Sequence, residues 1–187
     1  METVRGRECG GCAVCCTELH VNDAELRKLA RVRCPNLRDD CLCGIYETRP
    51  KACRIFECGW KSLAMLGDHW RPDRSGLMLI PKMTDNPPGY REGAGVQIML
   101  LKREALELPE LPGLIAQWFA ARVPMYLSVT APKGFVASAV FLNDRVLHPV
   151  RHRDRAALIR ALGEMADALS QQKLEPADFA RMPSAAT

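Results

Sequence analysis

The chain has 187 residues, of which 48% are hydrophobic and 26% are charged, and its formal net charge at pH 7 is +4. Enough apolar side chains are present to build a folded core, so the composition excludes a disordered chain. The net charge is small, so nucleic acid is not expected as a partner. The length fits one medium-sized domain, or a small metal-stabilised segment joined to a conventional one.

All nine cysteines lie between Cys9 and Cys58. Residues 1–8 do not resemble a signal peptide, and no apolar stretch approaches the roughly 20 residues that span a membrane, so we expect a cytoplasmic protein with no membrane partner. Cytosolic thiols stay reduced and nine is an odd number, so metal binding is expected rather than disulfides. We predict a cysteine-cluster metal-binding segment at 1–60 and a cysteine-free α/β portion at 61–187, which could form one continuous domain.

In the first part, the sequence predicts a short helix over residues 23–31. Asn22 is a suitable cap, Glu25 follows three residues later, and apolar residues then recur at helical spacing. Pro35 prevents this helix from continuing. A second helix is predicted to begin at the threonine, arginine and proline of residues 48–50 and to end near Cys58.

The second part is predicted to be a short antiparallel sheet packed with helices, which makes the fold class α+β. Apolar runs bounded by glycine, proline or asparagine predict strands at 76–82, 96–102, 125–130 and 135–142. The sequence Pro132-Lys133-Gly134 suggests a hairpin between the last two. Helices are predicted over 112–122 and, with Asp154 as cap, over 154–170, while 71–76 is expected to be a loop. Residues from 173 onward are expected to fray, although Phe179 could dock.

The densest cysteine run is Cys9-Gly10-Gly11-Cys12-Ala13-Val14-Cys15-Cys16, which places four thiols within eight residues. Its first three thiols reproduce the C-x2-C-x2-C spacing with which bacterial ferredoxins hold a cluster. The fourth thiol differs, because Cys16 follows Cys15 directly. Adjacent side chains tend to diverge, so one of this pair is expected to face a second metal or another edge of a polynuclear site.

The later cysteines are candidates for completing such sites. They are Cys34, Cys41, Cys43, Cys53 and Cys58, and Cys41 is the least regularly placed. Thiolates bind zinc tetrahedrally or hold iron–sulfur clusters, so an iron–sulfur, a zinc and a mixed or polynuclear site all remain open. Two zinc ions with eight thiolates carry a net charge of −4, which the neighbouring Arg49, Lys51 and Arg54 could offset.

These residues also resemble a known family. CGGCAVCC at 9–16, CPNL at 34–37 and CGIYETRPKACRIFEC at 43–58 are similar to the YkgJ-type cysteine-cluster family, whose members carry a CxxCxxCC motif. Members are described as zinc- or iron-chelating proteins, and some as iron–sulfur oxidoreductases. The resemblance covers about residues 9–60. It implies metal-binding roles for Cys9, Cys12, Cys15, Cys16, Cys34, Cys43, Cys53 and Cys58, with Cys41 as an extra thiol.

The sequence therefore predicts a metal-binding protein that coordinates zinc or iron, the iron free or in an iron–sulfur cluster, through eight cysteines. Two alternatives stay open: a cluster-dependent redox or protein-modifying enzyme, and a zinc-stapled module that binds a protein partner. A cysteine motif like this one also occurs in flagellin lysine methylases, but no motif for a methyl-transfer cofactor is recognisable here. No catalytic residue can be named, because no nucleophile–base pair or nucleotide-binding loop is visible.

Overall fold

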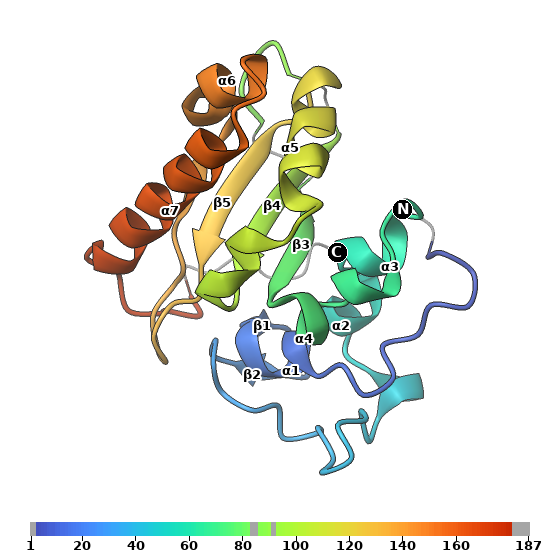
Figure 1. Ribbon diagram of the computed structural model, residues 1–187. Coiled ribbons are helices and arrows are strands. Elements are labelled where there is room, and N and C mark those ends of the chain that lie inside the picture. Colours follow the sequence, from blue (N-terminus) through green and yellow to red (C-terminus); the bar gives the residue numbers. More distant parts are fainter. Residues whose placement is uncertain (1–2, 83–85, 91–92, 181–187) are drawn as a thin grey trace.

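A computed structural model describes residues 3–82, 86–90 and 93–180 of the chain (Figure 1). Its larger part is a four-stranded sheet in the order β3, β4, β5, β6, formed by Leu77–Lys82, Gly95–Leu100, Met125–Val129 and Ala139–Phe141. Three helices accompany this sheet: α5 (Leu111–Ala120), α6 (Asn143–Arg151) and α7 (Arg155–Gln171). The prediction of an α+β fold is confirmed.

The sheet is mixed, however, and not wholly antiparallel as predicted. β3 and β4 are antiparallel, β4 and β5 are parallel, and β5 and β6 are antiparallel. The 3-10 helix η3 (Arg103–Glu107) and helix α5 lie between β4 and β5 in the sequence and carry the chain back to the end of the sheet at which β4 begins. A crossover of this kind makes consecutive strands parallel, whereas a tight turn makes them antiparallel.

The main core lies between one face of the sheet and the helices. Alternate strand residues such as Leu77, Leu79, Ile98 and Leu127 are buried in one cluster with apolar residues of α5, α6 and α7. On α7 the buried residues recur at helical spacing, at Leu158, Leu162, Ala166 and Leu169. Asp154 caps this helix by accepting a hydrogen bond from the Ala157 amide at 2.8 Å, as predicted.

The C-terminal residues do not fray within the described part of the chain. The Val136 amide donates to the Glu175 carbonyl at 3.2 Å, and the Ala177 amide donates to the Gly134 carbonyl at 2.8 Å. The strand predicted at 135–142 is therefore shortened to β6, because residues 134–136 pair instead with residues 175–177 of the C-terminal segment. The tail then reaches the first part of the chain, where Asn22 Nδ2 donates to the Phe179 carbonyl at 3.1 Å.

The first part is irregular, as predicted, with short elements only. They are α1 (Val14–Glu18), β1 (Val21–Asn22), β2 (Arg27–Lys28), the 3-10 helix η1 (Tyr46–Thr48), α2 (Lys51–Ile55) and α3 (Gly59–Ser62). Helix α2 lies in the predicted region, but it begins at Lys51 with Pro50 in the cap position, Thr48 belongs to η1, and the helix ends at Ile55. No helix in the described part of the chain is both long and apolar enough to cross a bilayer.

Two local predictions are wrong. Residues 23–31 form the turn and second strand of a small hairpin, in which Val21 pairs with Lys28 and Asn22 with Arg27. Asp23 is the reason, because its Oδ1 accepts from the Glu25 amide at 3.0 Å and so closes a turn that competes with a helix. Residues 71–76 are not simply a loop, because they contain the helical turn α4 (Pro72–Ser75), which follows the 3-10 helix η2 (Asp68–Trp70).

The cysteine-rich part packs directly against the sheet. A side chain at Gly59 would place its Cβ only 2.5 Å from Leu79 Cβ, so the backbone of α3 lies against β3 without room for a side chain. Arg7 holds the N-terminal segment against α3 and the residues after it. Its guanidinium donates to the carbonyl of Leu63 at 2.9 Å and also to those of Trp60 and Leu66. The predicted boundary at residue 60 thus falls inside α3.

Asn143 joins α6 to the sheet and is 1% exposed. Its Oδ1 accepts from the Met125 amide at 2.7 Å, and its Nδ2 donates to the Val123 carbonyl at 2.9 Å. Replacing Asn143 with alanine should lower the free energy of unfolding by about 1–3 kcal/mol, because a buried N–H group loses its partner. Urea denaturation followed by circular dichroism measures this loss. The exposed Gln171→Ala is the control, and an Asn143→Ala variant as stable as the control would contradict the prediction.

Candidate metal centre

The first cysteine run forms a tight turn followed by a short helix. The Cys12 amide donates to the Cys9 carbonyl at 2.9 Å, and Gly10 lies between them with φ of +51°, a value that favours glycine. Helix α1 then carries Cys15 and Cys16. The two adjacent thiols remain in contact, because the Cys15 thiol donates a hydrogen bond to Cys16.

Four thiols gather around a small second core, and we call them the Cys34 group: Cys16, Cys34, Cys43 and Cys53. The Cys34 amide donates to the Cys16 carbonyl at 3.0 Å, and Cys16 and Cys53 pack against the cluster that contains buried Cys34. Cys43 is held beside them by a bridge between its backbone and that of Leu37. Burial raises the pKa of Cys53, and the charges of the other three members act in the same direction.

The other four thiols form what we call the Cys9 group: Cys9, Cys12, Cys15 and Cys58. The hydrogen bond to Cys16 and then burial raise the pKa of Cys15, and the charges of Cys9 and Cys12 also raise it. Burial is the main cause that raises the pKa of Cys58, with a further contribution from Cys9. We therefore describe the eight thiols of the predicted set as two adjoining groups of four. The groups meet at Cys15 and Cys16, and the charge of Cys16 also acts on Cys9.

Cations lie beside both groups. Lys28 is 3% exposed, and its Nζ donates to the carbonyls of Val32 at 2.8 Å, Leu29 at 3.1 Å and also Leu19. The hydrogen bond from Cys15 lowers the pKa of Cys16 to about 7, and the charges of Lys28 and Arg49 act in the same direction. Arg49 therefore has the position expected for it.

Lys61 serves the Cys9 group in the same way. Burial raises the pKa of Cys9, while the charges of Lys61 and Arg49 oppose that rise. The other two cations named from the sequence, Lys51 and Arg54, act instead on Asp23, whose pKa is lowered mainly by hydrogen bonds from the Glu25 and Ala52 amides.

Sequence reasoning missed Lys28 and Lys61. The partners of Lys28 are backbone carbonyls, which leave no pattern in a sequence. Glu57 and Lys61 are four residues apart, a spacing that could have predicted the ion pair between them and so drawn attention to Lys61.

The cysteine-free part contributes one charged pair to the Cys9 group. Arg71 donates to both oxygens of the Asp73 carboxylate at 2.7 Å, and the Cys12 thiol hydrogen-bonds to the same carboxylate. Burial raises the pKa of Cys12 to about 11, and the negative charge of Asp73 adds to this rise. Residues on both sides of the predicted boundary therefore shape this group.

The thiols are gathered without converging on a point. Among the residues that the structure describes, no three His, Cys, Asp or Glu side chains are close enough together to hold a metal ion, and all nine cysteines are free thiols. Cys41 lies outside both groups, in a turn closed by a hydrogen bond from the Arg38 amide to the Leu42 carbonyl. The donors suit zinc or iron chemically, and metal binding would have to draw them together.

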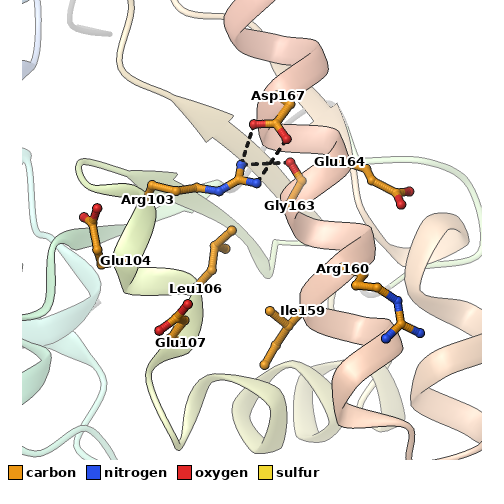
Figure 2. Close-up of a pocket in the computed structure, with 9 residues that line it drawn as sticks. All are labelled: Arg103, Glu104, Leu106, Glu107, Ile159, Arg160, Gly163, Glu164 and Asp167. Carbon is orange, nitrogen blue, oxygen red and sulfur yellow. Dashed lines mark hydrogen bonds and ion pairs between the residues drawn. The ribbon is translucent and has the colours of Figure 1, made fainter.

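A separate groove of about 410 Å³ lies between η3 and α7 (Figure 2). Arg103 spans it, donating to Asp167 at 2.8 and 3.1 Å and to the Gly163 carbonyl at 2.9 Å. The other lining side chains include the exposed Glu104, Glu107 and Glu164. No thiol lines this groove, so it is not part of the candidate metal centre.

Comparisons with known proteins found no significant match to this chain, whether with family models, with curated proteins or with solved structures. The resemblance of residues 9–60 to the YkgJ-type family therefore stays a prediction from the sequence motifs at 9–16, 34–37 and 43–58.

The unequal pKa values of the adjacent thiols lead to a prediction for the reduced, metal-free protein. At pH 7 iodoacetamide should alkylate Cys16 before Cys15, because the thiolate is the nucleophile and only Cys16 has a lowered pKa. Lowering the pH from 8 to 6 should slow the reaction at Cys16 roughly tenfold. Fragment-ion mass spectrometry of the labelled peptide measures both rates.

Lys28→Met should also slow the reaction at Cys16, because losing the positive charge raises the pKa of that thiol. The exposed Lys51→Met is the matched control and should leave the rate unchanged. Equal labelling of Cys15 and Cys16 in the unmodified chain would contradict the assignment.

Proposed function

We propose that this chain is a metal-binding protein that coordinates zinc or iron through eight cysteines arranged as two four-thiol sites. The supporting observation is that the eight thiols fall into the Cys9 group and the Cys34 group, each beside buried or half-buried cations. Four thiolates are a complete ligand set for a structural zinc ion, and also for an iron–sulfur cluster.

The cations support bound thiolates over neutral thiols. Lys28 is almost fully buried, and the hydrogen bonds described for it run to neutral carbonyl oxygens. Burying an ammonium group is costly unless an anion lies nearby. Two metal sites with four thiolates each carry an excess of negative charge, which Lys28, Arg49 and Lys61 are placed to balance.

Metal binding would also stabilise the part of the chain that carries the thiols. Among the described residues, the small core around the Cys34 group has three buried hydrophobic side chains, Leu26, Cys34 and Leu37, whereas the main core has many more. Segments with so little apolar burial often depend on metal ligands to fold. The metal would therefore act at least as a staple for residues 9–58.

A cytoplasmic location and a protein partner are part of the proposal. Nine free thiols suit a reducing compartment. The cysteine-rich part also exposes Leu42, Tyr46 and Ile55, at 41%, 40% and 56%, and these are side chains that a protein partner would cover.

Metal analysis of anaerobically purified protein tests the function directly. We expect two metal centres per chain, either two colourless zinc ions or iron that gives broad absorption near about 400 nm. A folded, metal-free protein that takes up neither zinc nor iron on reconstitution would refute the proposal. Cys43→Ser should lose one of the two centres, whereas Cys41→Ser, two residues away and outside both groups, should keep both.

Removing the metal should loosen one part of the molecule and leave the other intact. With a chelator under reducing conditions, amide hydrogen exchange in residues 9–58 should become faster, because these residues lose their cross-links. Exchange in β4 and β5 should stay slow, since these strands belong to the main core. Unchanged exchange in residues 9–58 would show that the metal is not a staple.

A further inference from the structure

The groove between η3 and α7 has an apolar floor and one closed end. Leu106 and Ile159 project into the space between the two elements (Figure 2). Arg103 closes one end, held by its hydrogen bonds to Asp167 and to the Gly163 carbonyl. A side chain at Gly163 would place its Cβ 2.9 Å from Arg103 Nη2, so Arg103 can lie across α7 only because this residue is glycine. The groove is therefore built into the packing of η3 on α7.

Two carboxylates beside this floor are not neutralised. Glu104 and Glu107 are exposed on η3, and no cation lies within ion-pair distance of either among the residues that the structure describes. Arg160 also belongs to the lining, but Figure 2 shows it pointing from α7 away from η3. An apolar floor beside open carboxylates suits the side chain of arginine or lysine, which has an apolar stem and a cationic end.

The corner between α6 and α7 presents such side chains. Five arginines and one aspartate lie within residues 145–160, and the aspartate, Asp154, is engaged as the cap of α7. Arg151 and Arg153 are exposed, and their side chains make no hydrogen bond or ion pair within the described part of the chain. Arg153 also has φ of +53°, a conformation that glycine adopts more easily. An arginine at such a position, without a partner in its own chain, indicates a contact with another molecule.

The basic corner and the groove lie on the same side of α7. Arg155, at the start of this helix, donates to the Pro109 carbonyl at 3.1 Å, and Pro109 follows η3 closely in the sequence. The groove is lined by α7 residues from Ile159 to Asp167. The corner and the middle of the groove are thus separated by about ten residues, or roughly 15 Å along the helix. Two surfaces of opposite charge arranged in this way complement each other about a two-fold axis that passes between them.

We propose that two copies of this chain associate through these surfaces, with α7 of one copy antiparallel to α7 of the other. Arg151 and Arg153 of each copy then reach the groove of the other copy and meet Glu104 and Glu107. The two-fold arrangement makes this contact twice. Arginine suits the contact, because its planar guanidinium binds a carboxylate through two parallel hydrogen bonds. The contact involves no thiol, so this inference is independent of the proposed metal binding.

Sedimentation equilibrium under reducing conditions measures the association and excludes dimers linked by disulfides. With rising protein concentration, the mass should increase from the 20.8 kDa of one chain toward twice that value. Salt at about 1 M should reverse the increase, because the screening length falls to about 3 Å. A protein that stays a single chain at every concentration, or a dimer that salt leaves intact, would overturn the inference.

Two charge-reversal variants locate the interface. The double variant Glu104→Arg/Glu107→Arg turns the groove basic like the corner, and Arg151→Glu/Arg153→Glu turns the tip of the corner acidic like the groove. Each variant alone should therefore remain a single chain. Mixed in equal amounts they should form a dimer, because both contacts again join opposite charges. A dimer in the mixture also shows that both variants are folded.

Reversing a charge elsewhere on the surface provides the matched control. The exposed Glu25→Arg and Lys133→Glu should associate as the unsubstituted chain does. Double variants that dimerise alone would place the interface on another surface, and double variants that stay apart when mixed would contradict the pairing of the corner with the groove. Either result overturns the inference and leaves the metal-binding proposal unaffected.

Discussion

Hydrogen bonds from cationic side chains to backbone carbonyls hold the cysteine-rich part of the chain in shape. Lys28 donates hydrogen bonds to carbonyls just after α1 and in the turn that follows β2. Arg7 donates to carbonyls in and after α3. Hydrogen bonds to charged groups contribute about 1.5–3 kcal/mol each, more than neutral ones. They replace the extensive apolar packing that this segment lacks. The positive charge of Lys28 also lowers the pKa of Cys16, so this one side chain both fixes the backbone and acts on the thiols.

The arrangement of the site follows from this scaffold. Asp23 closes the turn between β1 and β2 and, through Oδ2, accepts from the Ala52 amide at 2.9 Å, so it also fixes the start of α2, which carries Cys53. The positive charge of Arg49 lowers the pKa of members of both groups, Cys9 and Cys53 among them. Cys15 and Cys16, neighbours in one helix, place one ligand in each group.

The sequence was a good guide where regular structure was dictated by local chemistry, as in α7 with its cap at Asp154 and its apolar stripe. It failed where long-range contacts decided the outcome. Helix α6 has few apolar residues at helical spacing and depends on Asn143 reaching the start of β5. The sequence identified the cysteines as candidate ligands, and their role in metal binding stays a prediction. How they are distributed in space was not predictable, because it depends on backbone contacts such as those of Lys28, which leave no sequence pattern. Asp73 was missed because a carboxylate that contacts a distant thiol has no signature in sequence.

The contact between Asn22 and Phe179 has a consequence for biosynthesis. A chain leaves the ribosome from its N-terminus, so the thiol-rich segment emerges before the sheet and tail that it packs against have been made. At ordinary rates of synthesis this interval is roughly ten seconds. During that time the thiols are exposed to oxidants and to any available metal. Early capture of metal by the Cys34 group, whose members all lie within residues 16–53, would shield four of the nine thiols before the rest of the protein exists.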